Sequence, residues 1–429
     1  MSSENEQLKP FEARAIIEQL RKGTVPVEHV ARFTVGRQNW LKYIEDDLQN
    51  FIAEGGSKVR FINGDYGDGK THFMSIIRHL ALQQKFAVSF VVLTRDVPIQ
   101  KFEVIYQELV AQLIGQFSGT GIRAMLNHWL TTIETDFNGK KEDFSDKLLS
   151  LNEQLKNLPE MNINFSNALV SLVEHQYGQA DNEQSQEDWL QQKETLYLWF
   201  EGGKISKREL KPLQIFEALN KNNSKTLLRS LISFLHFQGY SGFILLLDEL
   251  ETIMAQSNAA RNAAYENVRL LIDNTEQSSY FHIFFSIIPD ILNAEKGFKS
   301  YDALWSRIRS IGDNKRLNYR SVLIDLHQTP LETKELIQLG KSICQIHEIS
   351  YRWSSDELIN NDLFEKICVA QERMGLLSEV RLFIKQVIRY LDIAEQGEVL
   401  NDDVEAQVIQ SQQEMEQEKL EQCQPDWDK

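Results

Sequence analysis

The sequence predicts an α/β fold in which helices flank a parallel sheet, with a large helical insertion and a C-terminal α-helical lid. Three apolar segments, residues 86–93, 242–247 and 280–288, have the length and the β-branched or aromatic content of buried strands. Helical patterns separate these segments, which is typical of parallel β–α–β units. Residues 118–213 show helical patterns alone, and the pattern is helical again from Pro330 onward.

The length of 429 residues favours two or three structural units. The polar N-terminal residues MSSENEQLKP do not resemble a signal peptide, and no segment approaches the roughly 20 apolar residues of a membrane span. The cysteines Cys344, Cys368 and Cys423 lack metal-binding spacing and are expected to be ordinary thiols in a reducing compartment. We therefore expect a cytoplasmic protein without a membrane partner.

The acidic charge of the chain is unevenly distributed. The net charge is −16, and residues 397–429 carry ten acids against two lysines, a net charge of −8. A surface that binds nucleic acid everywhere is therefore disfavoured, whereas a local basic site elsewhere stays compatible with this charge. Residues 396–429 are predicted to form an acidic tail, either a solvated helix or a flexible extension.

Residues 1–34 are predicted to form an N-terminal helical segment. Residues 11–22 have apolar side chains at helical spacing, and a second short helical pattern covers residues 27–33. The tripeptide Val35-Gly36-Arg37 follows and precedes an amphipathic pattern over residues 38–52. By itself, such a tripeptide also fits an ordinary turn before a helix.

A glycine-rich loop joins a predicted strand to a predicted helix. Residues 64–71 read G-D-Y-G-D-G-K-T, which is the P-loop pattern in its strand–loop–helix context. Glycines permit the tight turn, and backbone N–H groups with the helix N-terminus attract phosphate oxygens. Lys70 supplies a positive charge for the β and γ phosphates, and the Thr71 hydroxyl is a ligand for Mg²⁺. A plain glycine-rich turn is the alternative.

We therefore expect the chain to bind ATP together with Mg²⁺. The residues expected to contact the nucleotide at this loop are Gly64, Asp65, Tyr66, Gly67, Asp68, Gly69, Lys70, Thr71 and His72. The nucleotide-binding core is predicted to comprise residues 35–117 and 214–328, including a helix over residues 101–117.

Residues 118–213 are predicted to form a helical insertion in this core. Helical patterns cover residues 122–133, 144–155, 165–177 and 189–199. The tryptophans Trp129, Trp189 and Trp199 fall on apolar helix faces, so we expect them in the core.

A second half of a nucleotide site is predicted where the strand 242–247 ends. Asp248 and Glu249 follow this apolar run directly, and ligands bind at the carboxyl ends of strands in open α/β sheets. Asp248 is expected to hold Mg²⁺, and Glu249 to act as the general base for the attacking water. A surface turn is the alternative. We expect the loop and this acidic pair to meet on one magnesium ion.

The rest of the chain completes the core and adds the lid. A helix over residues 259–274 precedes the strand 280–288, and a strand is predicted at residues 321–326. Residues 329–395 are predicted to form the helical lid, with helices at 332–347, 355–371 and 376–391.

These features resemble AAA-type ATPases of the replication-initiator and signalling branches. The resemblance implies that Val35, Gly36 and Arg37 lie near the adenine. It also implies that Ser286, near the end of the strand 280–288, hydrogen-bonds the γ phosphate or the lytic water. A serine in a strand is otherwise an ordinary small polar side chain.

The same resemblance implies two arginine roles. Arg307 is the expected finger that stabilises charge on the phosphoryl group bound by a neighbouring subunit, which requires a homo-oligomer. Arg381 is the expected second sensor, reaching the phosphates from the lid, although Gly375 lies further from it than in typical members. Arginines near helix ends are common, so an ordinary structural role is the alternative for Arg307.

The chain resembles more particularly the ATP-binding proteins of BREX-type bacterial phage-defence islands. The resemblance extends to about residue 395 and rests on the loop 64–71 and on segments elsewhere: Ala13 to Leu20 with Gly23, Val35-Gly36-Arg37, Gly239-Tyr240-Ser241-Gly242, Leu246 to Glu251, Ala264 to Arg269, and Leu304 to Arg307. It implies a defence setting and a helicase or methyltransferase partner.

Two functions follow from these patterns. The first is an Mg²⁺-dependent ATPase that oligomerises and couples nucleotide state to DNA or a defence partner. The second is a nucleotide-gated signalling or scaffold protein with little turnover. A small G protein is disfavoured because the segment Asn220 to Asn223 lacks the guanine-binding Asp. A small-molecule kinase is disfavoured because Glu249 beside Asp248 fits water activation better.

Overall fold

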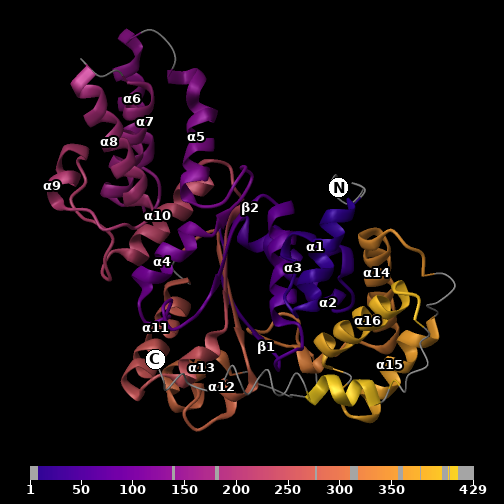
Figure 1. Ribbon diagram of the computed structural model, residues 1–429. Helices are drawn as coiled ribbons and strands as arrows, with labels where there is room; N and C mark the ends of the chain where they lie inside the picture. Colours follow the sequence, from indigo (N-terminus) through magenta and orange to yellow (C-terminus); the bar gives the residue numbers. More distant parts are fainter. Residues whose placement is uncertain are drawn as a thin grey trace, which may run out of the picture. The chain divides into compact units, whose positions relative to one another are not determined.

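A computed structural model describes residues 8–137, 141–178, 183–275, 278–309, 317–355, 361–376, 378–398, 404 and 406–413 (Figure 1). The chain divides into two compact units. The first unit comprises Met1–Lys42, Ile62–His79 and Ile324–Lys429, and the second comprises Tyr43–Phe61 and Leu80–Leu323. The P-loop belongs to the first unit, and the acidic pair belongs to the second.

The strands form one six-stranded sheet in the order β3-β2-β4-β5-β1-β6. They are β1 (Ser57–Asn63), β2 (Phe86–Val92), β3 (Leu113–Ile114), β4 (Gly242–Asp248), β5 (Phe281–Ile287) and β6 (Leu323–Asp325). In β4, Ile244 lies opposite Val88 and Leu245 lies opposite Ile283, and both pairings are parallel. The predicted α/β class and its mostly parallel sheet are thus confirmed, and they are compatible with a P-loop nucleotide-binding fold.

Strand β4 is buried along its whole length. Its five central residues, Phe243 to Leu247, are all apolar and fully buried. Strands β2 and β5 pair with its two edges, and α10 (Ser224–Phe237) packs against it. A strand covered on both faces needs apolar side chains at every position, which explains the unbroken apolar run in the sequence.

Helices of the second unit cover the sheet and form the insertion. Helix α4 (Phe102–Ala111) packs on β2 and α10. Four helices, α5 to α8, pack side by side beyond them (Figure 1). The bounds of the insertion and later helices are α5 (Ile122–Phe137), α6 (Lys141–Lys156), α7 (Ile163–Tyr177), α8 (Glu183–Phe200), α9 (Lys207–Leu210), α11 (Asn258–Thr275), α12 (Pro289–Asn293) and α13 (Asp302–Ile308).

The insertion has an aromatic core. Trp129 and Trp199 are buried as predicted, and Trp129 packs edge-to-face on Phe234. Trp189 is only partly buried. Its indole N–H donates to the His175 carbonyl oxygen, and its ring centre lies 4.3 Å from that of the His175 imidazole, with the two rings tilted by 30°. Large apolar surfaces of this kind explain why these helices pack without strands between them.

The predicted helix over residues 101–117 is wrong in its last third. Helix α4 ends at Ala111, and Leu113 and Ile114 form the short antiparallel strand β3 against β2. Gly119 and Gly121 both have a φ of +92°, which a continuing helix does not allow. The Leu113 side chain is fully buried in this position at the edge of the sheet.

The first unit joins the two ends of the described chain. Helix α1 (Pro10–Arg21) packs on α14 (Thr333–Tyr351) and α16 (Val380–Glu395), and α15 (Asn361–Arg373) packs on both of these lid helices. Arg21 of α1 donates to Asp392 of α16 at 2.8 Å, and the Nε2 of His347 lies 3.0 Å from the same carboxylate. The N-terminal helix is therefore part of the helical bundle of the lid.

Several predicted boundaries shift. The helix α2 (Gln38–Asp47) continues as a wider π-helical turn at Leu48–Ile52, and Val27–Phe33 is a 3₁₀ helix. Gly375, with a φ of +73°, and the turn after it delay the start of the last lid helix to Val380. Residues 356–360 and most of the acidic tail lie outside the described residues. The limits of insertion, lid and tail stay predictions.

None of the described helices combines the length and the apolar composition that crossing a membrane requires.

A buried ion pair anchors β1 in the second unit. Arg60 of β1 is completely buried and donates at 2.5 Å to Asp47, which is also buried. Lys58 donates to the same carboxylate at 2.7 Å. Burial lowers the pKa of Arg60, and the Asp47 charge opposes this effect. Asp47 therefore neutralises two cations in the first half of strand β1.

Replacing Asp47 by Ala should lower the free energy of unfolding of this unit by about 3–5 kcal/mol, because Arg60 then stays buried without its counter-charge. Urea unfolding followed by tryptophan fluorescence measures the loss. Asp46→Ala is the matched control, since Asp46 pairs with the exposed Arg320 and should change stability little. Equal effects of the two substitutions would contradict this role of Asp47.

Candidate nucleotide-binding site

The P-loop of the first unit follows β1 and ends on the helix α3 (Lys70–Gln83). Gly67 and Gly69 have φ values of +100° and +86°, which side-chain-bearing residues rarely adopt. The turn therefore depends on these two glycines. It leads directly into the N-terminus of a 14-residue helix, where backbone N–H groups and the helix dipole favour an anion.

Lys70 is held inside the loop that it is predicted to serve. Its ammonium donates to the carbonyl oxygens of Gly64 at 2.9 Å and Asp65 at 3.1 Å, and it lies 5.1 Å from the centre of the Tyr66 ring. The Tyr66 ring is about half exposed, whereas Lys70 is buried. These carbonyl oxygens compete with phosphate oxygens for the same three N–H donors.

Asp68 organises the loop. Its buried carboxylate accepts a hydrogen bond from the Asp65 N–H at 2.7 Å, and the Nε2 of His327 lies 2.9 Å away. Burial raises the pKa of Asp68, opposed by the Asp65 N–H and by His327. The Asp65 side chain is exposed and lies 3.1 Å from the same His327 nitrogen.

Sequence reasoning missed His327. This residue lies in a 3₁₀ turn after β6, and its Nδ1 is 3.3 Å from Asp325, which also accepts from the Asn63 side-chain amide at 3.2 Å. Ligand atoms of Asp65, Asp68 and His327 all lie within 4.8 Å of one another. The only sequence signal was a histidine directly after a predicted strand, which is too common to single out.

The Val35-Gly36-Arg37 tripeptide lies between the loop and the lid. Gly36 has a φ of +69°, and a Cβ there would lie 2.4 Å from the Leu331 side chain and 3.0 Å from Glu335 of α14. Arg37 has a φ of +57° and donates to the Asp68 carbonyl oxygen at 2.8 Å. Only glycine fits at position 36, because the lid leaves no room for a side chain there.

Arg37 brings its charge to the loop itself. Its guanidinium lies 3.6 Å from where a Cβ on Gly69 would be. Burial lowers the pKa of Arg37 to about 10, although Asp68 and Glu335 act in the opposite direction. A cation at this point favours phosphate, whereas contact with the adenine stays a prediction for Val35, Gly36 and Arg37.

His72 follows Thr71 in the first turn of α3. Its Nε2 lies 3.3 Å from the Thr34 hydroxyl, and its ring is 5.2 Å from that of Phe33. Burial lowers the pKa of His72 to about 4, and the Arg37 charge adds to the effect. His72 is therefore neutral and connects α3 to the N-terminal segment by its contacts with Thr34 and Phe33. Thr71, at the start of the same helix, is partly exposed.

Arg381 lies beside the loop within the first unit. It is at the start of α16, and its Cβ is 3.9 Å from the position that a Cβ on Gly67 would take. Its side chain also passes 3.3 Å from the equivalent position on Gly23. The structure thus brings Arg37, Arg381 and the P-loop together.

The acidic pair of the second unit is held by Ser286. Asp248 is buried at the end of β4, and the Ser286 hydroxyl of β5 donates to its Oδ1. The Glu249 N–H lies 3.0 Å from both Ser286 Oγ and Asp248 Oδ1. Ser286 therefore contacts the acidic pair itself, and its predicted contact with phosphate or water stays a prediction.

Glu249 has a strained backbone. Its φ and ψ are +64° and +39°, a left-handed conformation that costs a non-glycine residue free energy. The two hydrogen bonds to its N–H hold this conformation, and the 3₁₀ turn Leu250–Ala255 follows it. Strain of this kind concentrates at functional sites, because packing elsewhere must compensate for it.

Arg307 of α13 forms an ion pair inside its own unit. Its guanidinium donates to both oxygens of Asp273 on α11, at 2.5 and 3.0 Å. Arg269 donates to the same carboxylate at 2.8 Å. Arg307 is about one-third exposed, so this pair is open to exchange with another anion.

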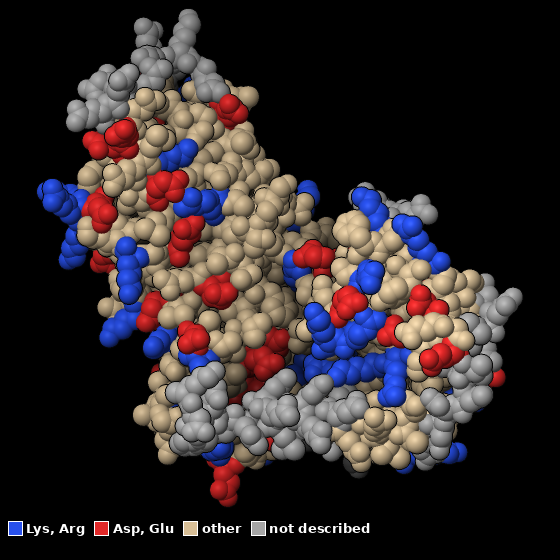
Figure 2. All heavy atoms as spheres, viewed as in Figure 1, with Lys and Arg blue, Asp and Glu red and all other residues tan. Residues whose placement is uncertain are grey.

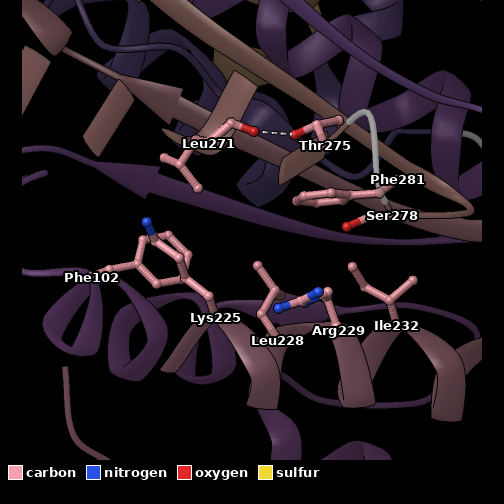
Figure 3. A pocket seen from close by; sticks show the side chains of 9 residues that line it. All are labelled: Phe102, Lys225, Leu228, Arg229, Ile232, Leu271, Thr275, Ser278 and Phe281. Atoms are coloured by element: carbon pink, nitrogen blue, oxygen red, sulfur yellow. Dashed lines mark hydrogen bonds between the residues drawn. The ribbon is translucent and has the colours of Figure 1, made fainter. Parts of the chain in front are cut away.

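A small cavity in the second unit is unrelated to these residues. It lies between α10, α11 and the start of β5, and Lys225 and Arg229 reach it among apolar side chains (Figure 3). Its volume of about 20 Å³ suffices for a single water molecule. It is too small for a nucleotide.

The two halves of the predicted site are each assembled within their own unit. The first contains Arg37, the P-loop, His72 and Arg381, and the second contains Asp248, Glu249 and Ser286. Their joint use of one magnesium ion stays a prediction.

The sequence of the chain matches a protein-family model over residues 8–410. This family is described as BREX system ATP-binding protein BrxC/D. No curated protein matches the chain.

The low pKa of His72 predicts acid sensitivity of the first unit. A histidine in the unfolded chain takes up a proton near pH 6.5, whereas the folded His72 does so only near pH 4. The unfolded state therefore binds more protons between these values, and stability falls as the pH falls through this window. Between pH 7 and pH 5, the free energy of unfolding should fall by about 1–2 kcal/mol less in the His72→Gln variant than in the wild type. Urea unfolding at the two pH values measures this difference. An equal fall in the free energy of unfolding in both proteins would refute the assignment of the acid sensitivity to His72.

Proposed function

The chain belongs to the family of BREX system ATP-binding proteins BrxC/D, and we propose that it is an Mg²⁺-dependent ATPase that oligomerises and couples ATP turnover to DNA or a protein partner in phage defence. The family ties the chain to ATP binding and to this defence system. The proposal goes beyond the family in four respects, which are ATP hydrolysis, dependence on Mg²⁺, oligomerisation and coupling to DNA or a protein partner.

The observation that carries the proposal is the geometry of the P-loop. Two glycines with positive φ turn the chain onto the N-terminus of α3, and the cations Lys70, Arg37 and Arg381 lie around that turn. Such an arrangement suits a polyphosphate, because N–H donors and positive charges meet many oxygens at once. Lys70 would leave its carbonyl partners for phosphate oxygens.

The proposed chemistry of hydrolysis rests on the acidic pair. Thr71 and Asp248 offer a hydroxyl and a carboxylate, the hard oxygen ligands that Mg²⁺ prefers. When bound, the metal would neutralise phosphate charge. Glu249 would accept a proton from the attacking water, and Ser286 would keep Asp248 and the Glu249 backbone in position. Ser286 is thus a positioning residue in this proposal.

A row of cations on α16 supports the DNA part of the proposal. Arg381, Lys385 and Arg389 recur every four residues, so they share one face of the helix. Figure 2 shows Lys and Arg gathered over the region where Figure 1 labels α16. On a chain with a net charge of −16, this local row is a surface that attracts phosphates of nucleic acid.

One observation favours the second candidate, a nucleotide-gated scaffold with little turnover. Arg307, the proposed finger, is bound to Asp273 of its own unit. An arginine engaged in this way is not available to a neighbouring subunit until the pair breaks. Slow turnover that a partner accelerates would then be the resting behaviour of the protein.

Glu249→Gln is the central test. It should reduce steady-state ATP hydrolysis by about 100-fold or more, because Gln cannot accept a proton, while ATP stays bound. Phosphate release and retention of radiolabelled ATP on a filter measure the two effects. Glu153→Gln, an exposed change on α6, is the matched control and should behave as the wild type.

Full hydrolysis by Glu249→Gln would overturn the assigned base. Wild-type protein that binds ATP but shows no turnover at any protein concentration, with or without DNA, would favour the scaffold.

Asp273→Asn should raise ATP turnover several-fold at high protein concentration, because weakening the pair frees Arg307 for a neighbouring subunit. Turnover measured across a range of protein concentrations tests this. The same substitution in an Arg307→Ala background should have no effect. An increase in ATP turnover that persists in the Arg307→Ala background would contradict the role of Arg307 as an arginine finger.

A further inference from the structure

An exposed basic segment, residues 204–216, follows α8 in the second unit. Its first eight residues, 204–211, carry four cations against one acid, a net charge of +3 on a chain whose total is −16. All four cationic residues are exposed: Lys204, Lys207, Arg208 and Lys211. Figure 2 shows Lys and Arg at the edge of the molecule where Figure 1 labels α9. The basic segment is therefore a local exception to the acidic character of the chain.

The four cations are not neutralised by any described carboxylate. None of them forms an ion pair or a side-chain hydrogen bond within the part of the chain that the structure describes. The preceding acids are bound elsewhere, since Glu194 and Glu201 both accept from Arg123 at 2.9 Å. Glu209, within the segment, accepts from the N–H and the hydroxyl of Ser206 at 2.9 and 2.6 Å. The cations are thus left for an external anion.

Two of these cations lie one helical turn apart. The Lys211 N–H donates to the Lys207 carbonyl oxygen, so the two lysines share one side of the turn. Like charges at this spacing repel and destabilise a helix. A row of phosphates would remove this repulsion, because each lysine could face a different phosphate.

The basic segment is held in one shape by α7 and by its own apolar residues. Its buried side chains are Leu210, Leu213 and Ile215. The side chains of Asn167 and Ser171 on α7 donate to the carbonyl oxygens of residues 214 and 213, at 2.8 and 3.2 Å. The Ile215 N–H donates to the Leu210 carbonyl oxygen at 3.2 Å and closes the turn. A surface that is already fixed loses little entropy when it binds a partner.

Phe216 adds an aromatic ring directly after this closed turn. The residue is 66% exposed, although its N–H is fixed by the side-chain oxygen of Asn164 at 2.8 Å. An apolar ring that is held in water costs free energy, and stacking against another flat group would recover it. The partner that fits this surface therefore has both negative charges and flat rings.

We propose that the basic segment binds single-stranded DNA, with Lys207, Arg208 and Lys211 facing its phosphates and an unpaired base stacked on Phe216. A single strand presents charges and bases together, whereas an acidic protein segment or a duplex would use the cations and leave the ring exposed. This surface belongs to the second unit, whereas the cation row on α16 belongs to the first. DNA is named rather than RNA because of the proposed function, and in that choice alone the inference rests on it.

The test titrates the full chain against fluorescein-labelled dT20 by anisotropy, without ATP and at several salt concentrations. Labelled rU20, a labelled DNA duplex of the same length and a labelled poly-glutamate peptide are titrated in parallel. The protein should bind dT20 at least as tightly as any of the other three, with an affinity that falls as the salt rises. Tighter binding of one of the other three, or no binding of dT20, would overturn the proposal.

Two variants locate the binding. Lys207→Gln combined with Lys211→Gln should weaken dT20 binding about tenfold and reduce the slope of log affinity against log salt by about 1.4, since each phosphate contact contributes about 0.7. Phe216→Ala should weaken binding about tenfold with an unchanged slope, because stacking releases no counterions. A purely structural role of the two lysines predicts an unchanged salt slope.

Each variant has a matched control in the same unit. Lys101→Gln combined with Lys296→Gln removes two exposed lysines elsewhere, and Leu190→Ala shortens a 60% exposed side chain on α8. Both controls should bind dT20 as the wild type does, and thermal unfolding shows that every variant is folded.

Unchanged affinity in both variants of the basic segment would overturn the surface even if dT20 binds elsewhere on the protein. Because binding is measured without ATP, an absence of ATP turnover, which would defeat the proposed function, leaves this result unaffected.

Discussion

The first unit depends on the buried carboxylate of Asp68. This one side chain accepts the Asp65 N–H and lies against His327, and the carbonyl oxygen of the same residue accepts a hydrogen bond from Arg37. The turn after β1, the 3₁₀ turn after β6 and the N-terminal segment thus meet at one residue. Because burial disfavours the charged carboxylate, its partners must stay in place for the loop to keep its shape.

This arrangement connects the P-loop to the lid through side chains of the lid that pack closely against glycines. Gly36 lets Leu331 and Glu335 approach, and Arg381 of α16 lies beside Gly67. A change at the loop that displaces Arg37 or Arg381 would therefore reach α14 and α16, which also carry α1. Such a chain of packed groups is the kind of element through which nucleotide state is transmitted.

In the second unit, the acidic pair lies at the end of a buried strand whose central residues are all apolar. Ser286 supplies the polar partner that Asp248 needs in this buried place, and it also holds the left-handed backbone of Glu249. The strain at Glu249 is supported by the sheet, since β4 and β5 pair in parallel up to Leu247 and Phe285. The strand pair thus fixes the Asp248 carboxylate and the backbone of Glu249.

The sequence alone determined the α/β class, strands β1, β2, β4 and β5, the P-loop and the acidic pair. These follow from local rules: strands covered on both faces need unbroken apolar runs, and a tight anion-binding turn needs glycine at fixed positions. It did not determine β3, where Leu113 pairs with the sheet edge, or the approach of His327 to Asp68 across more than 250 residues.

The packing of α1 onto the lid and the Arg307–Asp273 pair were likewise decided by tertiary structure. Each depends on which distant surfaces become neighbours, and on the charge or hydroxyl that burial then leaves needing a partner. No local pattern of residues carries that information, because the same Arg, His or Tyr in the same local sequence would be an ordinary surface side chain in a different packing.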